Sequence, residues 1–252
     1  MGKKSPETCE DGIVATDNFV AVIDGSTSKT PFQLSPTAKN GRYAMTLITR
    51  YIHAMPAQIS VEEFCQGVTT LFLSIYDSND MAERMSLHPE ERLCASAIVY
   101  SHARKEIWMV GDCQAMIDGM LYENPKPYED MIARQRVALI RQGIMPQEAR
   151  KRIEPLLVKA MKEGQNKAYA VIDGFPIYLQ GVRVIPVASH VQEIVLASDG
   201  YPFLHSSLQE SEAALAQQLA EDAQNISTFI ATKGLVEGNV SFDDRAYIRF
   251  CP

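Results

Sequence analysis

Apolar runs that stop abruptly at polar residues divide the first part of the chain into strands and helices. Phe19 to Ile23 is an apolar, largely β-branched run that ends at Asp24-Gly25, which is typical of a buried strand leading into a loop. From Arg42 to about Met55, apolar residues recur at helical spacing. A second helix is predicted to begin at Ser60, where Ser60 and Glu63 can form a capping box.

The middle of the chain combines short strands with a long charged segment. Strands are predicted over residues 94–100, 106–110 and 114–117, and their short separations favour an antiparallel meander. The segment at about 121–166 is charged and largely helical, and we expect Pro146 and Pro155 to interrupt or bend it. We interpret this segment as a helical insertion or flap.

The remainder of the chain alternates between strand and helix patterns. Strands are predicted over 168–172, 182–187, 193–197 and 246–250, and helices over 207–219 and 221–232. Strands in two groups, with helices between and after them, favour antiparallel sheets covered by helices over an alternating parallel sheet. With 46% hydrophobic residues in 252, the chain can bury one sizeable core, and we expect one domain over 1–252.

Composition narrows the classes of function. The formal net charge of -7 argues against nucleic-acid binding, which needs a surplus of Lys and Arg. No apolar run approaches the roughly 18 residues of a membrane span, and the first residues lack a secretory signal, so we expect a cytoplasmic protein without a membrane partner. The five cysteines lie far apart and form no Cys-x-x-Cys pair, which argues against zinc and redox sites.

Aspartate beside glycine recurs where apolar runs end. The four instances are Asp24-Gly25, Gly111-Asp112, Asp173-Gly174 and Asp199-Gly200. Each pair alone is also a common turn, and we interpret Asp173 in this way. Several carboxylates at one sheet edge would repel one another unless a divalent cation lay between them, and oxygen ligands favour Mg²⁺ or Mn²⁺ over zinc. The expected chemistry is attack by a metal-activated water on a phosphoryl or acyl centre.

The order of these motifs resembles that of the protein phosphatase 2C family, the metal-dependent PPM class, over most of the chain. The resemblance is carried by five motifs in sequence order: Glu10-Asp11, Val22-Ile23-Asp24-Gly25, Val110-Gly111-Asp112, Ser198-Asp199-Gly200 and Asp243-Asp244. It implies an α+β fold, a four-layer α-β-β-α sandwich of two antiparallel sheets flanked by helices. It also implies hydrolysis of phosphoserine and phosphothreonine in phosphorylated protein substrates, with two Mn²⁺ or Mg²⁺ ions.

Carried over residue by residue, the resemblance implies a set of metal ligands. Asp24 would bridge two ions and the Gly25 carbonyl would contact one of them, while Asp199 and Asp243 would complete the two sites. These three aspartates are the expected catalytic residues. Glu10 or Asp11 would act in the metal shell, and Asp112 is the candidate ligand of a weaker third ion.

The chain also departs from the pattern of that family. Ser26 stands where many members have a histidine that could act as an acid, Phe203 stands where an aspartate is common, and Ala246 ends the last motif. The phosphate-binding arginine near the N-terminus has no counterpart, and Lys4, or Lys3, is the available substitute. An alternative hypothesis is therefore a catalytically weak or inactive phosphatase-like module with a binding or regulatory role.

Two further patterns in the sequence have alternative interpretations. Val22-Ile23-Asp24-Gly25 superficially resembles the motif of haloacid dehalogenase-like phosphatases, but their nucleophilic aspartate corresponds to Val22, so that mechanism is excluded. A group of basic residues on the predicted helical flap alternates with acids, and we expect it to form a solvated face; the group comprises Arg150, Lys151, Arg152 and Lys159.

Overall fold

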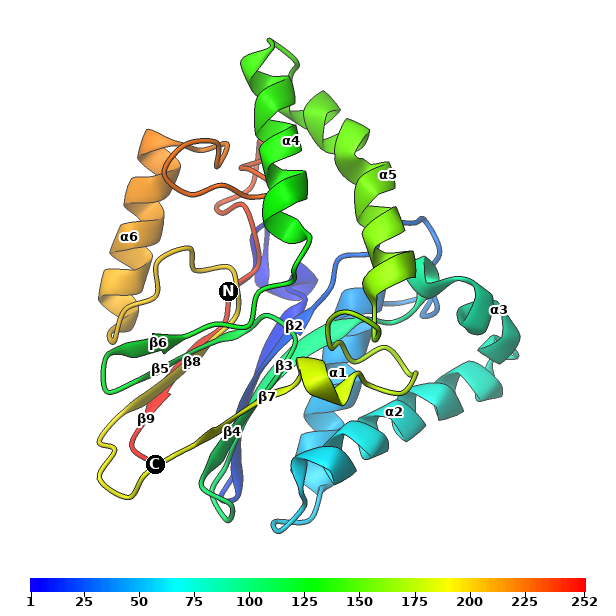
Figure 1. Ribbon diagram of the computed structural model, residues 1–252, viewed down its shortest axis with the longest axis vertical. Coiled ribbons are helices and arrows are strands. Elements are labelled where there is room, and N and C mark those ends of the chain that lie inside the picture. The colour runs from blue at the N-terminus through cyan, green and yellow to red at the C-terminus, as the bar shows by residue number, and fades with distance from the viewer.

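Two antiparallel β-sheets pack face to face, with helices on their outer faces, in the computed structural model, which describes residues 1–252 (Figure 1). The larger sheet has the strand order β1-β2-β3-β4-β7 and the smaller one β6-β5-β8-β9. The strands are β1 Asp11–Ala15, β2 Phe19–Gly25, β3 Ala95–Ser101, β4 Glu106–Val110, β5 Gln114–Ile117, β6 Met120–Tyr122, β7 Arg183–Pro186, β8 Ile194–Ala197 and β9 Tyr247–Phe250. The α-helices are α1 Asn40–Ala54, α2 Val61–Ser78, α3 Ala82–Leu87, α4 Glu129–Arg141, α5 Pro146–Gly164 and α6 Leu208–Glu221.

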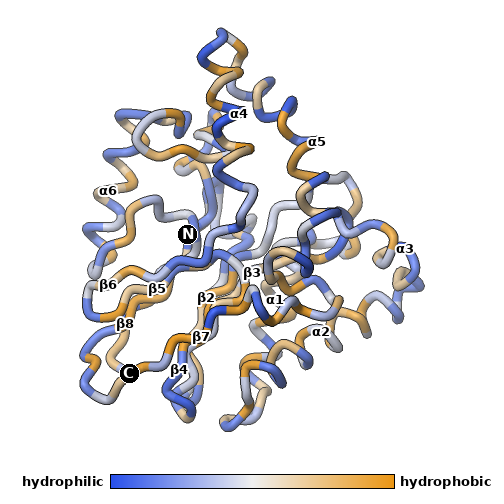
Figure 2. The backbone as a smooth tube through the Cα atoms, viewed as in Figure 1, coloured by the Kyte–Doolittle hydropathy of each residue, from blue (hydrophilic) through white to orange (hydrophobic).

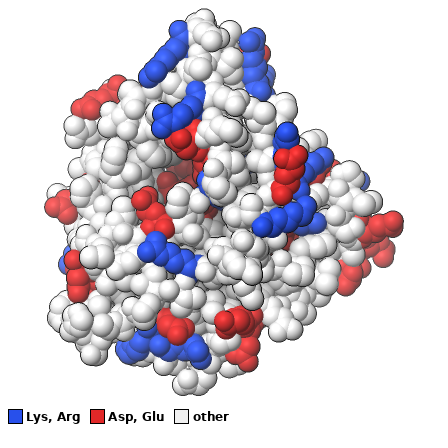
Figure 3. All heavy atoms as spheres, in the orientation of Figure 1, with Lys and Arg blue, Asp and Glu red and all other residues white.

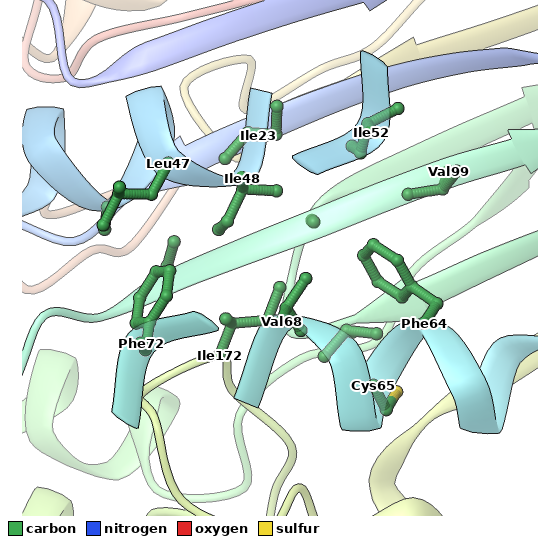
Figure 4. Close-up of a cluster of buried hydrophobic side chains, with 14 of the residues drawn as sticks. Ile23, Leu47, Ile48, Ile52, Phe64, Cys65, Val68, Phe72, Val99 and Ile172 are labelled. Carbon is green, nitrogen blue, oxygen red and sulfur yellow. The ribbon is translucent and has the colours of Figure 1, made fainter. Parts of the chain in front are cut away.

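Alternation along the central strands produces the layers. In β2, Ala21 and Ile23 face the core under α1 and α2, whereas Val22 faces the core between the two sheets. Figure 2 shows the hydrophobic colour concentrated along these strands. Figure 4 shows the first core, where Ile48 of α1 and Phe72 of α2 lie against the larger sheet. A smaller cluster of buried residues lies over the outer face of the smaller sheet, toward Tyr201. The predicted four-layer α+β sandwich is confirmed.

Local signals explain where several helices begin. The Ser60 hydroxyl accepts a hydrogen bond from the Glu63 amide at 3.2 Å, and the Glu63 carboxylate accepts one from the Ser60 amide at 2.8 Å, so the predicted capping box is present. The Ser207 hydroxyl caps α6 by accepting a hydrogen bond from the Glu210 amide at 3.2 Å, without the reciprocal bond to the Ser207 amide. Pro146 opens α5, where its missing N–H costs nothing, and Pro155 lies inside that helix rather than ending it.

Three sequence predictions are wrong. Strands 94–110 form a hairpin, but β5 joins the other sheet, because Gly111 at φ +100° turns the chain out of the meander. Residues 168–172 form only isolated bridges, and residues 222–232 contain no helix, because α6 ends at Glu221. The patterns also gave no indication of β1, β6 or α3.

Helices α4 and α5 form a hairpin that rises above the ends of the sheets (Figure 1). Arginines attach this hairpin to the segment 222–236. Arg136 donates to the Gln224 carbonyl at 2.8 Å, Arg141 to the Ile226 carbonyl at 3.2 Å, and Arg150 to the Thr232 carbonyl at 2.8 Å. None of the helices in the molecule combines the length and apolar character that crossing a bilayer requires.

Candidate active site

A row of polar side chains crosses three strands at one end of the larger sheet. In the β1–β2–β3 register, Asp11 lies opposite Asp24, and Asp24 lies opposite Ser96. Asp24 is two residues beyond Val22, so its side chain lies on the face that meets the smaller sheet. Directly paired residues have Cβ atoms about 4.5–5.5 Å apart, and like charges in such pairs repel. The register therefore brings Asp11 and Asp24 together.

Residues beside two strands of the smaller sheet complete the acidic site. Asp199 follows β8, and Asp243 precedes β9. Asp24, Asp199 and Asp243 line one cavity of about 90 Å³, which exceeds the roughly 10–15 Å³ that one water needs. Figure 3 shows acidic side chains in a hollow below the hairpin, with Lys and Arg side chains along the hairpin above it. The three aspartates predicted to be catalytic thus lie around a common space.

The surroundings of two carboxylates, Asp11 and Asp24, disfavour their charged forms. Burial, together with the charges of Asp199 and Asp244, raises the pKa of Asp11 from 3.8 to about 7. Burial and the charges of Asp11, Asp199 and Asp112 raise the pKa of Asp24 well above its ordinary value. A divalent cation between these carboxylates would favour their charged forms.

The other acids are partly neutralised by lysines. Lys3 Nζ lies 3.2 Å from Asp243 Oδ1, 3.1 Å from Asp244 Oδ2 and 3.8 Å from Glu10 Oε2. Lys233 forms a second ion pair with Asp243. No group of three or more acidic, histidine or cysteine side chains stands close enough together to hold a metal ion as the side chains lie.

Asp112 is also paired. Its carboxylate accepts a hydrogen bond from Ser96 Oγ at 2.6 Å and forms an ion pair with Lys126. Although burial acts to raise the pKa of Asp112, the charge and hydrogen bond of Lys126 hold it below its ordinary value. Phe203 occupies the position where an aspartate is common in the family that the sequence resembles. It packs edge to face on Phe229, with ring centroids 6.3 Å apart. No further carboxylate comes from that position to support a third ion.

Unsatisfied oxygens in the site fit a divalent cation. Asp11 Oδ2 and Glu10 Oε1 are buried and have no hydrogen-bond partner, although buried polar atoms are nearly always paired. Together with Asp24 they provide the hard oxygen donors that Mg²⁺ and Mn²⁺ prefer. Gly25 lines the same cavity as Asp24, and only glycine fits there, since a Cβ would lie 2.2 Å from the Gly41 carbonyl oxygen. The donor set therefore fits such an ion once the lysines release their carboxylates.

Two sequence-predicted positions lie away from the acids. Lys4 is exposed and forms no ion pair, and Lys3 is the lysine that reaches the site. Asp173 is fully buried in a structural network, where it accepts hydrogen bonds from Arg92, Gln165 and Asn166 at 2.7–2.8 Å. It lies in a turn with Gly174 at φ +85°. Asp173 thus has the structural role expected for a turn.

Four basic residues of the cavity were not predicted as site residues. They are Lys29, Lys126, Arg150 and Lys233. Arg150 had a readable signal, because it stands three and seven residues before Ile153 and Leu157 and so shares the buried face of α5. Its neighbours Arg152 and Lys159 are exposed, as expected for a solvated face.

Comparisons with known proteins address the fold. No family model and no curated protein matches the chain. Among solved structures, the serine/threonine phosphatase Stp1 from Staphylococcus aureus has a TM-score of 0.51 at 12% identity, covering 100% of this chain and 93% of that one. A bacterial serine phosphatase has a TM-score of 0.51 at 13% identity, with coverages of 98% and 93%. The catalytic domain of the serine/threonine protein phosphatase PstP, solved with two manganese ions, has a TM-score of 0.44 at 14% identity, with coverages of 99% and 93%.

Proposed function

We propose that this protein, which has the fold of bacterial serine/threonine phosphatases, is a metal-dependent phosphatase that hydrolyses phosphoserine and phosphothreonine in proteins. The observation that carries the proposal is the convergence of Asp11, Asp24 and Asp199, where two carboxylates have raised pKa values and Asp11 Oδ2 lacks a partner. Such a cluster is costly unless it serves to bind a cation.

Residues of both sheets would hold the ions. Asp24 and Asp199 supply carboxylates, Gly25 its carbonyl, and Asp11 and Glu10 the two unpartnered oxygens, while Asp243 becomes available when Lys3 and Lys233 turn away. When bound, Mn²⁺ or Mg²⁺ lowers the pKa of a coordinated water and offsets charge on the phosphoryl group. The basic residues that line the same cavity attract the phosphoryl oxygens and hold the phosphoester over the carboxylates.

The direct test is hydrolysis of p-nitrophenyl phosphate and of a phosphothreonine peptide by the purified protein with Mn²⁺. We expect turnover that EDTA abolishes and that Asp24→Ala and Asp199→Ala each reduce by at least about 100-fold, a loss of roughly 3 kcal/mol of transition-state stabilisation. Asp173→Asn, a buried aspartate outside the cavity, is the matched control and should affect thermal stability rather than metal dependence. Full activity of Asp24→Ala would refute the mechanism.

A non-catalytic role is the second candidate, and the lysine pairs favour it. Lys3, Lys126 and Lys233 already neutralise Asp112, Asp243 and Asp244 without an ion. A phosphatase-like binding module would keep these pairs and bind phosphorylated peptides without turning them over. Isothermal titration calorimetry with MnCl₂ separates the two, because the enzyme must take up Mn²⁺ and the binding module need not.

A further inference from the structure

A second cavity, of about 350 Å³, adjoins the one that holds the acids. Its wall contains six basic side chains and no acidic one: Lys3, Lys29, Arg136, Arg150, Lys151 and Lys233. We call it the basic groove. The chain as a whole carries a net charge of -7, so this is a local reversal of its charge.

Four of the six cations in the basic groove have no carboxylate partner. Lys29 Nζ donates to the Thr27 carbonyl at 2.5 Å, and Arg150 bonds only the Thr232 carbonyl. Arg136 is fully buried and donates to Gln224, while its Nε has no partner at all. Lys151 is exposed at the rim and forms no ion pair. Positive charge is therefore gathered here without compensation from the protein itself.

These cations destabilise one another's charged forms. Burial, together with the nearby charges of Lys233 and Arg150, lowers the pKa of Lys29 to about 7. Burial and the charge of Arg150 lower the pKa of Arg136 to about 10. An anion in the groove would remove this repulsion and form charge-assisted hydrogen bonds with several of the groups.

The position of the basic groove identifies which anion would reach it. Thr27, Lys29, Arg150 and Lys233 line both cavities, so a ligand in the groove lies next to one held over Asp24 and Asp199. An extended peptide advances about 3.3 Å per residue, so residues flanking a phosphorylated side chain fall beside its binding site. On the basis of the proposed function, we propose that the basic groove binds acidic residues that flank the phosphorylated residue, and that the protein selects acidic phosphopeptides.

Two fluorescein-labelled phosphothreonine peptides test this selection. They are identical except that the three residues on each side of phosphothreonine are Glu in one and Gln in the other. Binding is measured by fluorescence anisotropy with EDTA-treated protein, and hydrolysis by phosphate release with Mn²⁺. We expect the acidic peptide to bind at least about tenfold more tightly at low salt, and the difference to shrink as NaCl screens the charges.

The groove variants are Arg150→Gln and Lys151→Gln, and each is expected to reduce the neutral-to-acidic ratio of dissociation constants about threefold or more. Lys151 is exposed, so its replacement leaves folding intact even where Arg150→Gln does not. Arg152→Gln is the control, because Arg152 is a solvated residue of the same helix paired with Glu148 at 3.0 Å, and it should keep the parent ratio.

The outcomes separate the groove from the catalytic proposal. A ratio near one in the parent, or a ratio unchanged by both Arg150→Gln and Lys151→Gln, overturns the basic groove as a specificity site. Selective binding that Lys151→Gln weakens, in a protein without Mn²⁺-dependent turnover, supports the groove and overturns the enzyme. If both peptides bind equally and are hydrolysed at equal kcat/KM, the proposed phosphatase activity is supported and the basic groove is overturned as a specificity site.

Discussion

Replacing Asp11 by Asn should stabilise the metal-free protein, which is the reverse of the usual effect of a buried polar substitution. Asp11 is 9% exposed, lies opposite Asp24 in the sheet, and has a pKa raised from 3.8 to about 7. Between these two pH values the folded state keeps a proton that the unfolded state releases, so stability falls as the pH rises from about 4 to about 7.

The size of the effect follows from the pKa. Each pKa unit corresponds to about 1.36 kcal/mol, so ionising Asp11 in the folded protein costs about 4 kcal/mol above pH 7. Because an amide at this position still needs hydrogen-bond partners, we expect Asp11→Asn to recover only about half of this ionisation cost, roughly 2 kcal/mol. For a chain of this size that is a rise in Tm of about 4–8 °C.

The assay is thermal unfolding in EDTA at pH 8 and pH 5, followed by the same scans with MnCl₂. The gain of Asp11→Asn should be largest at pH 8 and shrink toward pH 5, where the parent carboxyl is already protonated. Added Mn²⁺ at 100 times Kd should stabilise the parent by about 2.7 kcal/mol and so raise its Tm, and it should raise the Tm of the variant less. Asp17→Asn, an exposed aspartate near the end of β1, is the control and should change neither value. A variant less stable than the parent at pH 8, or a gain equal at both pH values, would refute the reasoning.

Two further predictions concern the charged pairs. Lys3→Gln should tighten Mn²⁺ binding, measured by calorimetry, about 3- to 10-fold, because the ion no longer has to displace the Lys3 ammonium group from Asp243 and Asp244. Lys4→Gln, at an exposed position, is the control. Weaker Mn²⁺ binding by Lys3→Gln would contradict a competition between Lys3 and the ion. Arg92→Ala should cost about 3–5 kcal/mol, a fall in Tm of about 10 °C, because it leaves the fully buried Asp173 carboxylate without its cationic partner at 2.8 Å. Arg84→Ala, which removes the more exposed pair with Glu91, should cost much less, and equal losses would show that burial does not set the difference.

Elements with local signals were predictable from the sequence. The alternating apolar run of β2 and the capping box at Ser60 depend on neighbouring residues alone, and both are present. The predicted helix over 221–232 is absent because the Asp222 carboxylate accepts hydrogen bonds from the amides of Ile226 and Ser227, both at 2.7 Å, which a continuing helix would need for itself.

The acidic residues that line the cavity could be predicted from the sequence, whereas its basic residues could not. Asp24, Asp199 and Asp243 could be ordered along the chain because each is fixed at the end of a strand or just before one. Lys3 is far from Asp243 in the sequence, and Lys233 lies in a loop without periodicity, so no spacing rule connects either lysine to Asp243. Long lysine side chains also find their partners only when the tertiary structure is complete.

The attachment of the α4–α5 hairpin limits how this part of the molecule can be exchanged. Arg136, Arg141 and Arg150 bond carbonyls of the segment 222–236, which also carries Lys233. Grafting a hairpin from another protein would leave those carbonyls without donors, whereas the strands that carry the aspartates would be unaffected. The hairpin and this segment therefore form one unit, and an exchange of the hairpin that keeps these hydrogen bonds has to replace the segment with it.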